Sequence, residues 1–230
     1  MKTIILAAWK WTRLMPLTKN KPKPMVKIWN KPILEYILQS IKFFTNDVII
    51  ITKYKEDQIK NYFKNKWNNI NITYKTQWNK KWTWSALWWL NINEDFIVLN
   101  WDTIYDKKDL EKLYKLNWYW CLVKDVLEPE KYWIFYENKD HTAKQIIEKP
   151  KKFIWNLANI WVYKFPSRFI KIVENIKLSS RWEYELPDAI NKLLENTKFY
   201  LIKQKWDFID IWYPQDIIKA TEHLKKKWIL

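Results

Sequence analysis

The stretch LAAWKWTRLMPLT, residues 6–18, decides the fold, because an apolar strand ends here and runs directly into a loop. A strand ending in Ala-Ala before such a loop is typical of sites where consecutive backbone N–H groups bind a polyphosphate. The main chain must approach the ligand closely at positions 9 and 11, yet the sequence has Trp9 and Trp11 there. The pattern therefore predicts a phosphate-binding loop that carries two of the bulkiest side chains.

The composition offers an explanation for these tryptophans. The 230 residues include 0 Gly and 19 Trp, whereas a globular chain of this length carries roughly 16 Gly. Since the two deviations nearly cancel, we interpret many Trp letters as positions that are glycine in the working protein. A gene in which UGA encodes glycine, read with a code in which UGA encodes tryptophan, would produce this pattern. A genuinely Trp-rich protein is the alternative.

Charge and cysteine content limit the classes of function. The net charge of +16 suggests a nucleic-acid-binding protein, but the lysines are scattered and form no basic tail, which favours small anionic ligands instead. The lone Cys121 excludes an internal disulfide and indicates a reducing, cytoplasmic compartment. The apolar run at the start is too short for a signal peptide, and no stretch is long enough to span a membrane. We therefore expect neither a nucleic-acid nor a membrane partner.

Short β-branched runs alternate with amphipathic segments, which predicts βαβ units around a largely parallel sheet in one α/β domain. Region 118–165 is β-rich, and we expect its smaller elements to form a lid. Strands are predicted at residues 3–8, 47–52, 69–74 and 95–100. Helices are predicted from Pro32 to about residue 41 and at residues 55–65, 83–90, 107–116, 168–176, 185–195 and 215–226.

With glycine at positions 9 and 11 the opening stretch becomes LAAGKGTRLMPLT. This string resembles the signature loop of the sugar-phosphate nucleotidylyltransferases, enzymes that join a nucleoside triphosphate to a sugar 1-phosphate. A lone glycine-rich loop is more often a structural turn, but here the other motifs of the family follow in order. The resemblance implies that the loop binds the nucleotide through Leu6, Ala7, Ala8, Trp9, Trp11, Thr12 and Arg13, with Arg13 catalytic.

Two further segments resemble the nucleotide side of this family. KPKPMVKIWNKPILEY, residues 21–36, resembles its second signature, which implies that Lys23 is catalytic and meets the reacting phosphates. The alternative is a solvated lysine. TQWNKKWTWSAL, residues 76–87, resembles the segment beside the nucleobase, which implies nucleotide binding by Gln77, Trp82 and Thr83. For Gln77, an exposed amide at a strand end is the alternative.

FIVLNWDTIYD, residues 96–106, is an apolar strand that ends in Asn-x-Asp. A carboxylate just beyond a central strand lies where α/β sheets bind ligands, although an isolated Asp is more often a turn former. FIDIWYPQDIIKA, residues 208–220, resembles the segment that supplies a second carboxylate. The resemblance implies that Asp102 and Asp210 hold Mg²⁺.

Three segments resemble the sugar side of the family: KYWIFYENKDHTAKQIIEKP at residues 131–150, NIWVYKF at 159–165 and SRWEYELPDAI at 180–190. Asp188 in the third segment could equally cap a helix. The residues that the resemblance implies for the sugar phosphate are Tyr132, Trp133, Glu148, Lys149, Asn159 and Glu183.

The resemblance implies a Rossmann-like three-layer α/β/α sandwich with a mixed, mostly parallel central sheet and a small β lid. We expect one domain, with a nucleotide-binding half over about 1–115 and a sugar-binding half over about 116–230, and no β-helix extension. In the implied reaction, GTP, dTTP or UTP and a sugar 1-phosphate give a nucleotide sugar and pyrophosphate. The motifs do not choose among these triphosphates, and a homo-oligomer is compatible with the sequence.

Three alternatives to this function remain open at this point. The first is a cytidylyltransferase of the same fold acting on a phosphocholine-like substrate, against which the sugar-side motifs argue. The second is a basic, Trp-rich nucleic-acid-binding protein, which would need clustered exposed rings. The third is a regulatory homologue without turnover, which the presence of Asp102 and Asp210 disfavours.

Overall fold

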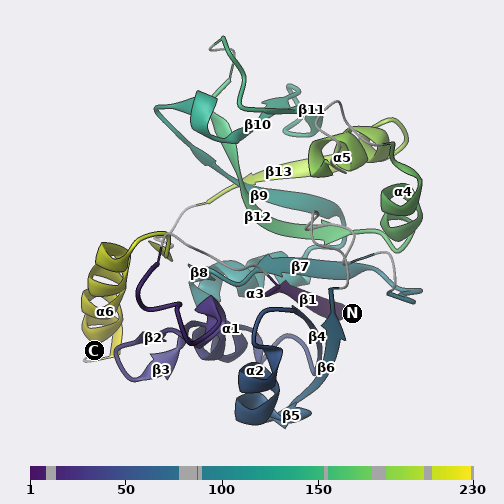
Figure 1. Cartoon of the computed structure of the whole chain (residues 1–230). Helices are drawn as coiled ribbons and strands as arrows, with labels where there is room; N and C mark the ends of the chain where they lie inside the picture. Colours follow the sequence, from purple (N-terminus) through teal and green to yellow (C-terminus); the bar gives the residue numbers. More distant parts are fainter. Residues whose placement is uncertain are drawn as a thin grey trace. The chain divides into compact units, whose positions relative to one another are not determined.

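A computed structural model describes residues 1–8, 14–77, 87, 90–152, 155–177, 185–204 and 209–228. The chain divides into two compact units (Figure 1). Unit 1 comprises Met1–Ile4, Gln77–Leu99 and Leu116–Lys205, and unit 2 comprises Ile5–Thr76, Asn100–Lys115 and Trp206–Leu230. Strand β1, Lys2–Leu6, begins in unit 1 and ends in unit 2.

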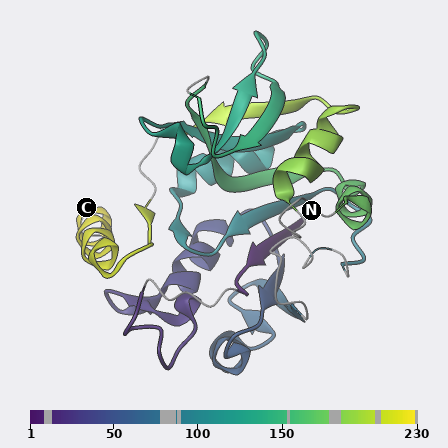
Figure 2. The same ribbon diagram turned by 45° about the horizontal axis from the view of Figure 1, so that its top comes forward.

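Unit 1 is built on a mixed sheet in which the strands follow the order β11-β10-β12-β7 and β9 lies between β12 and β13. The β9–β13 pair is parallel, and the pairs that β12 makes with β7, β9 and β10 are antiparallel. Helix α5 packs against β11 and α4 (Figure 2). The elements are β7 Phe96–Asn100, β9 Tyr119–Asp125, η3 Pro129–Lys131, β10 Trp133–Glu137, β11 Ala143–Glu148, β12 Leu157–Phe165, α4 Phe169–Asn175, α5 Leu186–Leu194 and β13 Phe199–Lys203.

Unit 2 is built on strands in the order β1-β4-β6-β5, with β4 and β6 parallel. Two short antiparallel pairs, β2–β3 and β8–β14, supplement this sheet. The elements are η1 Lys23–Met25, β2 Lys27–Ile28, β3 Lys31–Pro32, α1 Ile33–Ile41, β4 Asp47–Thr52, α2 Glu56–Phe63, β5 Lys66–Trp67, β6 Ile70–Thr76, β8 Thr103–Ile104, α3 Lys107–Lys115, β14 Ile209–Asp210 and α6 Pro214–Trp228.

Helix α1 shows how the local sequence produces this structure. Pro32 at its N-terminus has a φ of −59° and lacks the N–H that a first turn would leave unpaired. The apolar residues then recur at helical spacing, and all of them are fully buried: Ile33, Leu34, Ile37, Leu38 and Ile41. Burying each such side chain contributes about 1.5–3 kcal/mol, so packing rather than intrinsic propensity holds this helix.

The predicted α/β class with a mixed sheet is confirmed, and most predicted elements lie within a few residues of the observed ones. The β-rich region forms β9 to β12, with β10 and β11 as an antiparallel hairpin at the edge of the sheet (Figure 1). Most of the predicted helix at 83–90 lies outside the described residues. The split into a nucleotide-binding and a sugar-binding half stays a prediction.

Among the described residues, two tryptophans have left-handed backbone angles. Trp29, in the turn between β2 and β3, has a φ of 54°, and Trp161, within β12, has a φ of 63°. The register of β12 against β9 shifts between Asn159 and Tyr163, so Trp161 lies in a β-bulge. Left-handed angles are unfavourable for bulky side chains and are the conformation that glycine adopts readily.

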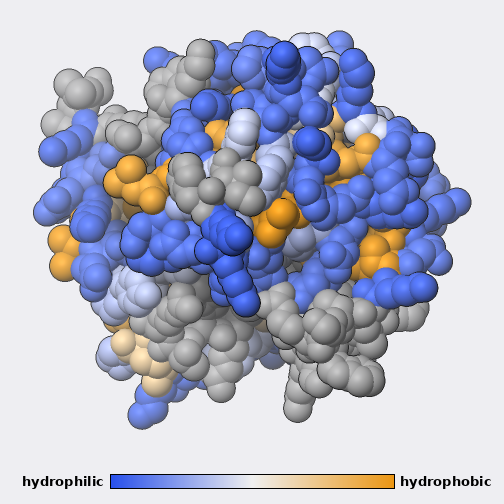
Figure 3. All heavy atoms as spheres, turned by 90° about the horizontal axis from the view of Figure 1, so that it is seen from above, coloured by the Kyte–Doolittle hydropathy of each residue, from blue (hydrophilic) through white to orange (hydrophobic). Residues whose placement is uncertain are grey.

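Hydrophilic side chains dominate the face of the molecule that Figure 3 shows, as the net charge of +16 leads us to expect. Among the described residues, every helix is too short or too polar to cross a lipid bilayer.

Candidate functional site

The first candidate site lies in unit 2, where Lys23 and Asp102 form a buried ion pair. Lys23 Nζ lies 3.1 Å from Asp102 Oδ2, and the two side chains are 0% and 4% exposed. Lys23 opens η1 between Pro22 and Pro24, whose rings restrict the backbone of this turn. Asp102 follows β7 by two residues, and its carbonyl accepts a hydrogen bond of 3.0 Å from Ile211 N. A solvated Lys23, the alternative from the sequence, is therefore wrong.

The other carboxylate oxygen of Asp102 is unusual. Oδ1 is buried and has no hydrogen-bond partner among the described residues. Burying a carboxylate oxygen without a partner is costly. Such an atom marks a place where a cation or a hydrogen-bond donor from a ligand fits.

Asp210 is brought to the same place by its backbone. Strand β14 pairs antiparallel with β8, and Asp210 is the register partner of Thr103, the residue after Asp102. The main chain of Asp210 therefore lies on a short β-ladder, and that of Asp102 lies one residue before the same ladder. Just beyond it, the backbone N–H groups of Trp212 and Tyr213 donate to Asp216 Oδ2 at 2.9 and 2.8 Å, which caps the start of α6.

The end of β1 lies beside β4 in unit 2. Ala7 N donates to Ile51 O at 2.8 Å, and Leu6, Ala7 and Ala8 are all buried. The predicted loop residues Trp9, Trp11, Thr12 and Arg13 lie outside the described residues, as do Trp82, Thr83 and Glu183.

The second candidate site lies in unit 1 and gathers five residues predicted for the sugar phosphate. Trp133 is the register partner of Glu148 across the β10–β11 pair. Lys149 N donates to Tyr132 O at 2.8 Å, which holds the two chain segments together beyond the strands. The ring centroid of Trp133 lies 4.5 Å from that of Trp161, the residue two positions after Asn159. Their contact with a sugar phosphate stays a prediction.

Asn159 is 3% exposed and its side chain has internal partners. Its Oδ1 accepts a hydrogen bond of 3.0 Å from Trp161 N and a weak one of 3.4 Å from Cys121 Sγ, while Nδ2 donates to Tyr163 OH. These bonds fix the bulge of β12. Burial raises the pKa of the Cys121 thiol well above its ordinary value, so this cysteine is poorly suited to act as a nucleophile.

Gln77 follows β6 directly and is 7% exposed. The alternative of an exposed amide is therefore wrong, while its contact with a nucleobase stays a prediction.

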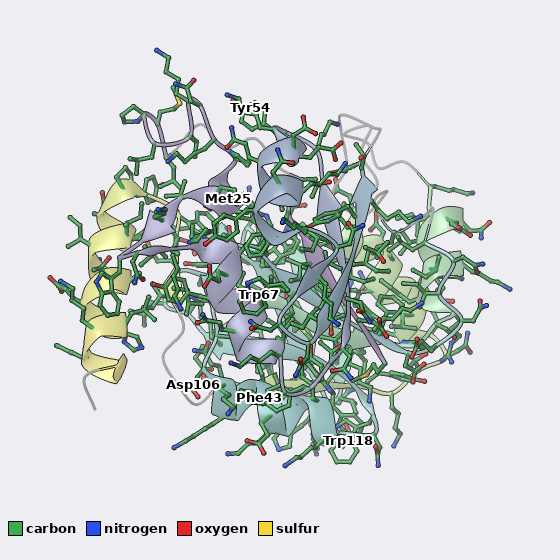
Figure 4. The ribbon with its side chains drawn as sticks, turned by 90° about the horizontal axis from the view of Figure 1, so that it is seen from below. Met25, Phe43, Tyr54, Trp67, Asp106 and Trp118 are labelled. Atoms are coloured by element: carbon green, nitrogen blue, oxygen red, sulfur yellow. The ribbon has the colours of Figure 1, made fainter. Side chains whose placement is uncertain are left out.

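Sequence reasoning missed a cavity of about 540 Å³ in unit 2. It lies beside the end of α1, β8 and α6, and Phe43 and Asp106 are two of its lining residues (Figure 4). Lys107 Nζ lies 3.9 Å from the centre of the Phe43 ring, which is a cation–π contact. The segments that form this cavity are distant in sequence, and although three of the quoted motifs extend into its lining, none of them predicts a cavity here.

Fold and sites together define a class: a mixed α/β protein with a buried carboxylate, that of Asp102, just beyond the carboxyl end of strand β7, where such proteins bind ligands. Comparison with known proteins then assigns the family. The nucleotidyl transferase family matches residues 2–227, and the chain belongs to that family.

Similar proteins from archaea carry names consistent with this family. The chain is 35% identical over 229 residues to the bifunctional protein GlmU of Methanocaldococcus jannaschii, covering 99% of this chain and 55% of that protein. It is 29% identical over 240 residues to the UTP–glucose-1-phosphate uridylyltransferase AglF of Haloferax volcanii, covering 99% and 98%. The chain spans about half the length of several curated relatives it matches.

A solved structure of UDP-glucose pyrophosphorylase complexed with UDP-glucose superposes with a TM-score of 0.85, covers 98% of each chain and shares 23% sequence identity. At this identity the likeness concerns the fold alone. It agrees with the α/β class predicted from the sequence.

Proposed function

We propose that the chain is a sugar-1-phosphate nucleotidylyltransferase, which joins a nucleoside triphosphate and a sugar 1-phosphate to give a nucleotide sugar and pyrophosphate. The buried Lys23–Asp102 pair, in which Asp102 Oδ1 has no hydrogen-bond partner among the described residues, carries this proposal, because the family motifs assign Lys23 to the reacting phosphates and Asp102 to their metal. Family membership and the names of the relatives support the same activity.

In the proposed reaction an oxygen of the sugar phosphate attacks the α-phosphorus of the triphosphate in line, and pyrophosphate leaves. The attacking oxygen is already anionic, so the step needs positioning and charge neutralisation rather than a general base. Arg13 and the backbone amides from Leu6 to Thr12 would neutralise the leaving pyrophosphate. Lys23 would bridge the α-phosphate and the sugar phosphate.

The remaining predicted residues would bind the two substrates. Gln77, Trp82 and Thr83 would face the nucleobase. Contacts to the sugar phosphate would come from Tyr132, Trp133, Glu148, Lys149, Asn159 and Glu183.

We propose Mg²⁺ as the cofactor, held by Asp102 and Asp210. The donor set fits, because both residues offer the oxygen ligands that this cation prefers and Asp102 Oδ1 is buried without a partner among the described residues. When bound, the cation would supply positive charge against the phosphate oxygens. Within the described residues no group of three or more His, Cys, Asp or Glu side chains comes together as a metal site, so the phosphates themselves would complete the coordination.

Recoding of UGA as glycine is part of the proposal. The chain has 19 Trp and 0 Gly, and Trp29 and Trp161 have positive φ angles. Glycine at Trp101 would also free space beside Lys23, whose Nζ lies 4.5 Å from the centre of that ring. We expect the printed chain to be inactive and activity to require glycine at positions 9, 11, 82, 84, 101, 133, 161 and 212.

The experiment is a pyrophosphate-release assay on the printed chain and on the chain with these eight glycines, named here the eight-glycine chain. Each would be tested with UTP, dTTP, GTP and CTP against several sugar 1-phosphates and phosphocholine. UTP comes first because AglF carries uridylyltransferase in its name. We expect pyrophosphate from the eight-glycine chain with UTP, dTTP or GTP and a sugar 1-phosphate. A soluble, folded eight-glycine chain that forms no nucleotide sugar would contradict the proposal.

We further propose a cytoplasmic enzyme that supplies nucleotide sugars for cell-envelope polysaccharide and acts as a homo-oligomer. A reducing compartment suits the single buried thiol of Cys121. Light scattering of the purified chain would test the oligomer, and a monomer at micromolar concentration would rule it out.

A further inference from the structure

The ammonium of Lys23 lies on the carboxylate that is proposed to hold the metal. Nζ is 3.1 Å from Asp102 Oδ2, and neither side chain has appreciable contact with solvent. We propose that Lys23 is a built-in counter-cation that keeps divalent metal off Asp102 until a triphosphate arrives. This inference rests on the proposed function, because it assigns the order of binding at the same site.

A bare divalent cation would meet an unfavourable exchange at this site. At Asp102 Oδ1 it would share the carboxylate with the ammonium of Lys23, which lies 3.1 Å from Oδ2, and the two positive charges would repel. To avoid this repulsion the carboxylate must separate from Lys23, whose side chain is 0% exposed. An ammonium that is separated from its carboxylate without reaching water is strongly disfavoured. The metal therefore has to compete with an internal cation, and we expect it to bind weakly alone.

A triphosphate changes this balance because it brings negative charge of its own. Its oxygens offer Lys23 a new partner, and Asp102 then becomes available to the metal. Metal and triphosphate should thus bind cooperatively, and each must raise the affinity for the other by the same factor. Lys23 acts here as a positioning residue for the cation, in addition to its proposed contact with the phosphates.

Trp101 adds to the hold on Lys23 in the printed chain. Its ring centre is 4.5 Å from Nζ, within the range of a cation–π contact. Because Trp101 is one of the positions proposed to be glycine, the test is made in the printed chain and repeated in the eight-glycine chain.

The test measures binding of Mn²⁺ alone, by the electron paramagnetic resonance signal of free Mn²⁺, without nucleotide or turnover. Lys23→Met removes the ammonium and keeps an unbranched side chain. Lys27→Met is the matched control, since Lys27 is an exposed lysine four residues further along. We expect Mn²⁺ to bind Lys23→Met at least about tenfold more tightly than it binds the unsubstituted chain or the control. Equal or weaker binding by Lys23→Met would overturn the proposal.

Two additional variants keep the test decisive if Lys23→Met is poorly folded, since it leaves the Asp102 carboxylate buried without its lysine. In that case Mn²⁺ itself should restore the circular dichroism spectrum of Lys23→Met, and failure to do so counts against the proposal. The double variant Lys23→Met/Asp102→Asn should fold without metal and bind no extra Mn²⁺. Asp102→Asn alone should also bind none, and tight binding by either variant would place the Mn²⁺ elsewhere and overturn the proposal.

The outcome is separable from that of the proposed function. Tighter Mn²⁺ binding by Lys23→Met in a chain that releases no pyrophosphate would uphold the counter-cation and refute the transferase activity. If instead the chain with Lys23 releases pyrophosphate, and Lys23→Met leaves Mn²⁺ binding unchanged, the transferase activity is upheld and the counter-cation is refuted.

Discussion

The left-handed backbone at Trp161 makes a quantitative prediction about which residue this position requires. Its φ of 63° lies in the bulge of β12. A left-handed conformation costs an L-residue with a Cβ about 1–2 kcal/mol, and glycine avoids that cost. We therefore compare Trp161→Gly with Trp161→Ala, because both variants lose the ring contact with Trp133 at 4.5 Å and differ by a single methyl group, which is what restricts the backbone.

The expected difference follows from two opposing contributions. Glycine avoids the strain of the left-handed backbone, which is about 1.5 kcal/mol at the middle of the range. Ordering the glycine backbone on folding costs roughly 0.5–1 kcal/mol more than ordering that of alanine, which offsets part of this gain. Trp161→Gly should therefore be about 0.5–1 kcal/mol more stable than Trp161→Ala. Trp29, with a φ of 54°, should show the same order.

Urea unfolding followed by far-ultraviolet circular dichroism measures these differences as shifts of the midpoint. The control is the same pair of substitutions at Trp67, a β5 residue outside the left-handed positions. There alanine should be the more stable of the two by roughly 0.5–1 kcal/mol. The expected result is that glycine is the more stable variant at position 161 and alanine is the more stable variant at position 67. Trp161→Ala at least as stable as Trp161→Gly would refute the argument that this bulge requires glycine.

Three further predictions concern other described residues. Burial raises the pKa of Glu56, but hydrogen bonds from Lys60 and two threonines outweigh it and hold the pKa below its ordinary value of 4.5. This contribution to stability is present above pH 4.5 and is lost as the pH falls through the folded pKa. Glu56→Gln should therefore reduce the loss of stability at acidic pH, measured as the fall of the urea midpoint of unfolding with falling pH. An unchanged fall of the midpoint would refute this prediction. Asn159→Ala leaves a backbone N–H in the bulge without its acceptor and should lower the free energy of unfolding by about 1–3 kcal/mol, whereas an unchanged urea midpoint would contradict this. The buried Cys121 thiol should react with a thiol reagent only after unfolding, and rapid labelling of the native chain would disprove it.

The elements that local pattern determines could be predicted from the sequence. Helix α1 follows Pro32 and has five apolar residues on one face, and β4 is a continuous β-branched run. Both signals lie within ten residues of chain. By contrast, β2–β3 and β8–β14 are pairs of two-residue strands, which are too short to show any periodicity. The β8–β14 pair also depends on contact between segments that are distant in sequence. Strand β13 was missed for a related reason, since its parallel partner β9 is remote in sequence.

The candidate site divides in the same way. The motifs predicted Lys23 and Asp102 separately, but not that they form a buried pair across 79 residues of sequence. Nor could a pattern show that Oδ1 of Asp102 lacks a partner among the described residues, because burial arises from the whole of unit 2. The composition predicted that glycine is missing, and the motifs predicted it at position 161. Position 29 lies outside the predicted set of eight, and only its backbone angle favours glycine there.

The number of tryptophans at positive φ does not by itself establish glycine, because Lys55, Lys64, Asn68, His141 and Lys149 also have positive φ. A chain with 0 Gly must fill every left-handed position with another residue. Asn and His adopt this region several times more readily than most residues, whereas it is strained for bulky ones. The stability order at position 161 is therefore informative where the count is not, since it measures what that backbone position favours. The codons of the gene give an independent answer, because recoding at positions 29 and 161 requires UGA there, and UGG at both would exclude it at these positions even if glycine proved more stable there.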